Sequence, residues 1–79
     1  MVTRIYYSNG WHNIKPNDRI HSTRALRSFC LSNCLPDNLI RLQGGWYHLR
    51  QDGQLAFITK ALSDLTFKQV FHIYQPSQS

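Results

Sequence analysis

The chain has little acidic charge and few cysteines. Its 79 residues include no Glu, four Asp and two Cys. Four isolated aspartates provide neither the carboxylate pair of a glycosidase nor an acidic cluster for Mg²⁺, which disfavours both kinds of enzyme. Two cysteines are too few for a disulfide framework, so we expect reduced thiols and a cytoplasmic location.

Long apolar runs and phosphate-binding loops are also missing. The longest apolar run is Leu55 to Ile58, whereas a membrane span needs about 20 residues. No secretion signal opens the chain, and Gly44 and Gly45 are explained as a turn rather than as part of a glycine-rich phosphate loop. We therefore expect a small soluble domain that has no membrane partner, holds no cofactor or metal, and is not an enzyme.

Positive charge is abundant and clustered. Nine Lys and Arg give a net charge of +5, and six of the nine are Arg, whose guanidinium group binds phosphate in a bidentate manner. The segment from Arg19 to Arg50 holds five Arg against Asp37 alone, which is +4 of the total. This clustering favours a polyanionic partner, although a solvated basic surface that only aids solubility has the same composition.

The sequence predicts an α+β fold. Outside the centre of the chain, the pattern of residues predicts a hairpin and two helices. β-formers at residues 2–7 and 11–14, joined by a turn at Ser8-Asn9-Gly10, predict a hairpin. Ser22 is the expected N-cap of a helix over 22–34, whose apolar stripe is formed by Leu26, Phe29, Cys30 and Cys34.

A second helix is expected over 66–74. Thr66 and Gln69 match a capping box, and Leu65 with Val70 matches a hydrophobic staple. A strand over Leu65 to Tyr74 remains the alternative, because this segment is also rich in β-formers. Residues 75–79 are expected to be a frayed tail.

The central segment predicts a three-stranded antiparallel meander, at about 39–43, 46–50 and 54–59, with two-residue turns at Gly44-Gly45 and Asp52-Gly53. These turns place Leu42 opposite Tyr47, and Ile40 opposite Leu49. The resulting apolar face, completed by Ala56 and Ile58, is expected to pack inward. The other face is expected to be outward, basic and aromatic, and it contains Arg41, Trp46, His48, Arg50 and Phe57.

The outward face is the leading candidate site, because aromatic rings stack on bases and cations neutralise phosphates on such sheets. Arg24 and Arg27 on the first helix are expected to add contacts to the nucleic-acid backbone. In the alternative interpretation, other elements cover Leu39, Leu55 and Phe57 as a second small core, and only two arginines stay at the rim. The two interpretations predict different burial for Phe57.

The string from Asn38 to Leu55, with the helix before it, resembles the wing and recognition helix of winged helix-turn-helix DNA-binding domains. The resemblance covers residues 22–55. It implies that Ser22, Thr23, Arg24 and Arg27 enter the major groove and that Arg50 contacts phosphate. The two helices that precede the recognition helix in that family are missing from this sequence, since residues 2–14 are predicted as β.

The leading hypothesis is a small, non-catalytic nucleic-acid-binding protein, for example a regulator, that binds DNA or RNA. The first alternative is a protein-interaction module or a phage- or plasmid-type inhibitor of a host protein, with Trp46, Arg50 and Phe57 in the interface. The second is a metal-independent ribonuclease toxin, which requires two of the four histidines to converge. Cys30, Cys34 and His21 as zinc ligands are a weaker hypothesis, because the short-spaced ligand pairs are absent.

Overall fold

The structure is a computed structural model in which residues 3–74 are described. The elements follow the chain in the order β1 (Thr3–Tyr7), β2 (Gly10–Ile14), α1 (Thr23–Ser32), β3 (Leu39–Leu42), β4 (Gly45–Leu49), β5 (Leu55–Thr59), a 3₁₀ turn (Leu62–Asp64) and α2 (Phe67–Tyr74). The predicted α+β fold, with an N-terminal hairpin, a three-stranded meander and two helices, is confirmed. The tail predicted at 75–79 lies outside the described residues.

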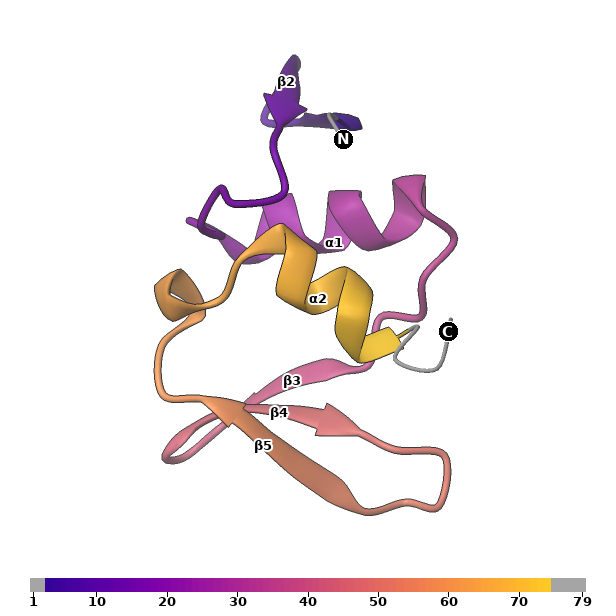
Figure 1. Ribbon diagram of the computed structural model, residues 1–79, viewed down its shortest axis with the longest axis vertical. Helices are drawn as coiled ribbons and strands as arrows, with labels where there is room; N and C mark the ends of the chain where they lie inside the picture. Colours follow the sequence, from indigo (N-terminus) through magenta and orange to yellow (C-terminus); the bar gives the residue numbers. More distant parts are fainter. Residues whose placement is uncertain (1–2, 75–79) are drawn as a thin grey trace.

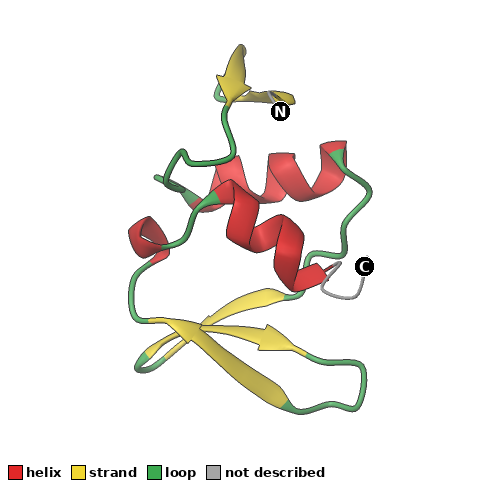
Figure 2. Ribbon diagram, in the orientation of Figure 1, coloured by secondary structure: helices red, strands yellow, loops and turns green. Residues whose placement is uncertain are grey.

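The elements form three layers (Figure 1). The β1/β2 hairpin lies at one end, α1 and α2 form the middle layer, and the β3-β4-β5 meander lies at the other end (Figure 2). The core is centred on the middle layer, and its largest fully buried side chains are Ile5, Ile20, Leu26, Cys30, Phe67 and Val70. The two sheets are therefore attached to opposite sides of one helical layer.

Helix α1 begins and ends through local hydrogen bonds. The Ser22 hydroxyl accepts from the backbone N–H of Ala25 at 3.1 Å, as expected of an N-cap. Leu26, Phe29 and Cys30 are buried as predicted. Cys34 is exposed, so its placement on the stripe was wrong. The helix ends at Ser32, and Cys34 takes a left-handed conformation with φ of 56°, outside the helical repeat.

Helix α2 confirms the capping box and excludes the strand alternative. The backbone N–H of Thr66 donates to Gln69 Oε1 at 2.9 Å, and the backbone N–H of Gln69 donates to Thr66 Oγ1 at 3.3 Å. Leu65 and Val70 are both buried, as a staple requires. Local hydrogen bonds therefore start a helix here despite the content of β-formers.

The loop after the hairpin is joined to the start of α2 by backbone hydrogen bonds. The N–H of Ile20 donates to the carbonyl oxygen of Leu65 at 2.9 Å. The N–H of Phe67 donates to the carbonyl of Asp18 at 3.2 Å, and that of Lys68 to the carbonyl of Pro16 at 2.9 Å. This pairing links positions almost fifty residues apart in the sequence. It fixes the end of the hairpin beside the first turn of α2.

The register of the first meander turn differs from the prediction. The turn is made by Gln43 and Gly44, so Leu42 pairs with Gly45, and Ile40 pairs with Tyr47. Gly45 is the first residue of β4, and a Cβ there would lie 2.5 Å from the carbonyl oxygen of Thr59. Close approach of the end of β5 therefore requires a residue without a side chain at position 45.

The second connection also differs, because it has three residues rather than two. Arg50 N–H donates to the carbonyl of Gln54 at 2.8 Å, and Gly53 takes φ of +85°, as in a three-residue hairpin loop. The extra residue pairs Leu49 with Leu55, and Tyr47 with Phe57. This shift by one residue places the side chains of residues 55–57 on the face of the sheet opposite to the predicted one.

A bulge restores the predicted register at the end of β5. Trp46 pairs with Thr59 although Tyr47 pairs with Phe57, so Ile58 is the extra residue on the bulged strand. Trp46 and Leu39 are buried in the core, and Ile58 packs against it. The predicted inward and outward faces were wrong, because the face with Ile40, Leu42, Tyr47 and Leu49 points away from the helices and gains Leu55 and Phe57.

Candidate functional site

The seven residues of the sequence-predicted site do not form one surface. Arg24 and Arg27 are exposed on α1, Trp46 and His48 lie on the inner face of the meander, and Phe57 lies on its outer face. Arg41 and Arg50 are exposed in β3 and directly after β4. The structure therefore leaves Trp46, His48 and Phe57 without a common stacking surface.

Trp46 and His48, the two aromatic residues on the inner face of the meander, pack against the rest of the protein. Trp46 is 8% exposed and belongs to the core. His48 meets Tyr74 of α2 edge to face, with ring centroids 5.2 Å apart. Burial, and secondarily the neighbouring charge of Arg50, lowers the pKa of His48 below its ordinary value of 6.5. Both side chains attach the meander to the rest of the protein.

The predicted arginines differ in their partners. Arg27 pairs with Asp37 at 3.3 Å and Arg50 with Asp52 at 3.7 Å. Both pairs are exposed, and such pairs contribute little to stability. Within residues 3–74, Arg24 and Arg41 have no ion-pair partner, so their charges are available to an anion.

The outer face of the meander is apolar rather than basic. Tyr47 and Phe57 meet edge to face at 5.4 Å. Phe57 is 53% exposed, which contradicts the interpretation in which it lies in a second core. The six side chains on this face are Ile40, Leu42, Tyr47, Leu49, Leu55 and Phe57. Contiguous apolar surface of this kind commonly marks a protein contact.

The basic and aromatic surface lies instead on the N-terminal hairpin. Tyr6 pairs with Trp11 across the strands, and Arg4 with Asn13, so these four side chains share one face. The Arg4 guanidinium carbon lies 4.8 Å from the Trp11 ring centroid, and the Tyr6 ring meets that of Trp11 at 5.3 Å. Tyr6 is 51% and Trp11 61% exposed. We call Arg4, Tyr6 and Trp11 the hairpin cluster.

The hairpin cluster was not among the residues predicted from the sequence, although its signal is present there. Thr3 to Tyr7 alternates between exposed and buried positions, and the Ser8-Asn9 turn sets the pairing. A two-residue turn at Ser8-Asn9 by itself places Arg4, Tyr6 and Trp11 on one face of the hairpin. The arginines are clustered in the centre of the sequence, whereas the exposed Trp11 and Tyr6 are near its start.

Beside the hairpin cluster lies a pocket of about 470 Å³ that contains titratable side chains. The Tyr7 hydroxyl lies 2.8 Å from Nε2 of His21, and the His12 ring stacks on the Tyr7 ring with centroids 4.0 Å apart. Asp18 and Arg19 also line this pocket. His12 and His21 therefore both contact Tyr7, one at its ring and the other at its hydroxyl.

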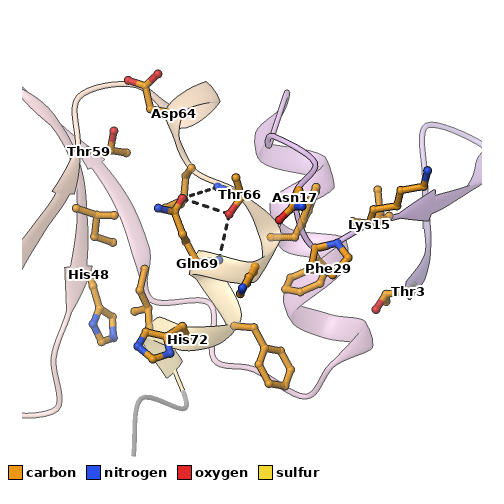
Figure 3. Close-up of a pocket in the computed structure, with 18 of the residues that line it drawn as sticks. Thr3, Lys15, Asn17, Phe29, His48, Thr59, Asp64, Thr66, Gln69 and His72 are labelled. Carbon is orange, nitrogen blue, oxygen red and sulfur yellow. Dashed lines mark hydrogen bonds between the residues drawn. The ribbon is translucent and has the colours of Figure 1, made fainter. Parts of the chain in front are cut away.

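A cavity of about 1580 Å³ runs along α2 (Figure 3). It is lined by residues of the 14–17 loop, α2 and the meander, among them His48 and His72. Its Thr66 and Gln69 side chains already bond to each other as the capping box of α2. Apolar surface predominates in the lining, although Asn17, Asp64 and Lys68 also contribute to it. This groove therefore offers mainly packing surface.

The cysteines and acidic residues form no metal site in the described part of the chain. No group of three His, Cys, Asp or Glu side chains converges within residues 3–74. Burial, and secondarily Asp37, raises the pKa of the Cys30 thiol to about 11, which disfavours the thiolate that metals bind. Within the same residues, no helix is long and apolar enough to cross a membrane.

We compared the chain with protein-family models, with curated proteins and with solved structures, and none of them matches it. The resemblance of residues 22–55 to winged helix-turn-helix domains therefore stays a prediction. In the structure the element before α1 is the β1/β2 hairpin.

Proposed function

We propose that this protein binds a single-stranded nucleic acid through the hairpin cluster. The observation that carries the proposal is the exposed arrangement of Trp11, Tyr6 and Arg4 on one face of a two-stranded ribbon. A half-exposed indole with a guanidinium above it offers a base a stacking surface and offers the neighbouring phosphate a cation. Stacking is tolerant of sequence, because every base has an aromatic face.

The charge distribution supports the same partner. All nine Lys and Arg are exposed. Arg4 lies in the hairpin and Lys15 directly follows it, while the backbone hydrogen bond from Lys68 to Pro16 brings a third cation to the same end of the molecule. Within residues 3–74, none of these three side chains has an ion-pair partner. Counterion release from such cations would drive binding to a polyanion.

Fluorescence anisotropy with a labelled 12-nucleotide single strand tests the proposal. We expect the affinity to fall steeply between 50 and 200 mM salt, because phosphate contacts dominate. Trp11→Ala is expected to weaken binding about 10-fold or more, since a stacked base contributes about 1–3 kcal/mol. Arg4→Gln should weaken binding and reduce the salt dependence by about one phosphate contact.

Phe57→Ala is the matched control, because Phe57 is similarly exposed but lies on the far sheet. It should leave the affinity unchanged. If Phe57→Ala weakens binding and Trp11→Ala does not, the hairpin is not the site, and the meander site predicted from the sequence gains support. Arg24, Arg27, Arg41 and Arg50 are then the residues to replace, and a duplex is the ligand to compare, as the winged-helix resemblance implies.

A second candidate function is supported by the apolar outer face of the meander. We infer that a second copy of the chain covers it. The six side chains of this face carry no formal charge, so two copies can pack sheet on sheet around a two-fold axis without placing like charges in contact. Sedimentation velocity would detect the dimer. Phe57→Ser should abolish it, whereas Leu31→Ser, at an 82% exposed site on α1, should not.

A cytoplasmic location is part of the proposal. Cys30 and Cys34 are both free thiols, and Cys34 is exposed. An exposed thiol persists in a reducing compartment, whereas an oxidising one favours disulfides. A regulatory role in the cell is also an inference from nucleic-acid binding.

A further inference from the structure

We propose that the pocket beside the hairpin cluster cleaves RNA by attack of a ribose 2′-hydroxyl, with His12 as the general base and His21 as the general acid. This inference rests on the proposed binding of a single-stranded nucleic acid by the hairpin. The pocket is lined by Tyr7, Trp11, His12, Asn13, Ile14, Asp18, Arg19, His21 and Phe67.

His12 is held in a tautomer that suits a base. Its Nε2 lies 3.3 Å from the backbone carbonyl oxygen of Tyr7. A carbonyl oxygen only accepts hydrogen bonds, so Nε2 carries a proton, and in the neutral imidazole the lone pair is then on Nδ1. The stacked Tyr7 ring, 4.0 Å away and nearly parallel at 22°, further fixes the orientation of the imidazole.

His21 is held by the other end of the same tyrosine. Its Nε2 lies 2.8 Å from the Tyr7 hydroxyl. When His21 is protonated, as a general acid must be, the phenol oxygen accepts from its Nε2–H, which leaves Nδ1–H as the proton available to a leaving group. Tyr7 is only 9% exposed, so it is a rigid positioning residue that spaces the two histidines.

The charged groups around the histidines are Asp18 and Arg19. One Asp18 oxygen accepts from the backbone N–H of Lys15 at 2.9 Å, which partly satisfies the carboxylate. Arg19 donates from one nitrogen to the Ser63 carbonyl at 3.2 Å. The guanidinium retains other N–H groups, and these are suited to the charge that develops on a pentacoordinate phosphorus.

Trp11 connects the pocket to the proposed binding surface. Its ring belongs to the hairpin cluster, and the same residue lines the pocket beside His12. Across the hairpin Trp11 pairs with Tyr6 and His12 pairs with Ile5, so Trp11 and His12 lie on opposite faces of the ribbon. A strand stacked on Trp11 would therefore pass around the edge of the hairpin to bring a phosphodiester to the histidines.

The reaction balances without a metal or an added reactant. His12 Nδ1 takes the proton of the 2′-hydroxyl, and the 2′-oxygen forms a bond to phosphorus. The bond from phosphorus to the 5′-oxygen breaks, and the imidazolium of His21 gives its proton to that oxygen. The products are a 2′,3′-cyclic phosphate and a 5′-hydroxyl. DNA cannot react in this way, because it has no 2′-hydroxyl.

The test uses the purified full chain in EDTA with two labelled 12-nucleotide strands, RNA and its 2′-O-methyl analogue. We expect the RNA to be cut to 2′,3′-cyclic phosphate ends and the analogue to be bound but not cut. His12→Gln and His21→Gln should each lower the rate at least about 100-fold while keeping the affinity for the analogue. His72→Gln, at an exposed position on α2, is the matched control and should cleave like the wild type.

Tyr7→Phe tests the positioning role. It keeps the ring and removes the hydroxyl that holds His21. We expect a lower rate and a displaced limb of the bell-shaped pH–rate profile, whereas a variant with only a packing defect would keep the shape of the profile. Circular dichroism confirms that each variant is folded.

Three outcomes would overturn the inference. Binding of the analogue without cleavage of RNA removes the catalysis and leaves the proposed function in place. Failure to bind either strand overturns both. Cleavage that survives His12→Gln and His21→Gln comes from another site or a contaminant, and it overturns the assignment of these residues.

Discussion

The N-terminal hairpin and the meander divide their side chains between faces in different ways. In the hairpin, Ile5 and Ile14 face the core, and Arg4 and Trp11 face outward. In the meander both faces carry large apolar side chains, with Trp46 inward and several half-exposed aliphatic and aromatic residues outward. The hairpin therefore has one buried and one chemically distinctive face, whereas the meander has two faces that are each able to pack.

This difference separates two kinds of partner. An outward Trp, Tyr and Arg combine stacking with charge, as single-stranded nucleic acids require. An outward apolar sheet without charges is suited to another protein surface. The two candidate functions consequently belong to opposite ends of the molecule, and variants at one end can be tested without disturbing the other.

The largest expected effect comes from truncating Ile5, the buried side chain of the hairpin. Ile5 is completely buried beside α1, and Ile5→Ala should lower the free energy of unfolding by about 2–5 kcal/mol. Leu55→Ala, at a 45% exposed site on the meander, should cost about 0.5 kcal/mol or less in a dilute sample, where the inferred dimer is dissociated. Urea denaturation measures both. Equal losses would show that the outer face of the meander is buried in solution.

The next effect concerns the close approach inside the meander. A Cβ at Gly45 would lie 2.5 Å from the Thr59 carbonyl and 3.0 Å from the Cα of Lys60. Gly45→Ala should therefore destabilise the protein by about 2–4 kcal/mol, from overpacking and from its φ of +146°. Gly53→Ala meets no atom within 4 Å and should cost only about 1 kcal/mol of backbone strain. Urea midpoints that agree for the two variants would contradict the observed register.

The smallest effect is a pH dependence at the joint between the meander and α2. Because the pKa of His48 is lowered in the folded state, its contribution to stability is fully present above pH 6.5. It is lost as the pH falls from there toward the folded pKa, since the unfolded chain binds the proton more tightly. Urea midpoints between pH 5 and 8 should vary less in His48→Gln than in His72→Gln. If the urea midpoint varies with pH in both variants as it does in the wild type, His48 is as solvated as the exposed His72.

The elements were predictable because their signals are short-range. Ser22 caps α1 and the Thr66–Gln69 box starts α2 through hydrogen bonds that span three residues. The candidate site was less predictable. Trp46 and Phe57 share a face under a two-residue turn, and the third residue in the loop before β5 places them on opposite faces. A single residue in loop length reverses the faces of a strand, and Asp52-Gly53 fits both lengths.

The sequence by itself determined the positions of the strands and helices, their caps and the excess of positive charge, because each depends on neighbouring residues or on composition. Only the tertiary structure decided which face of the meander the helices cover, because both faces are apolar enough to be buried. Only the tertiary structure brought His12 and His21 to the two ends of Tyr7, because this requires the chain after the hairpin to fold back against it.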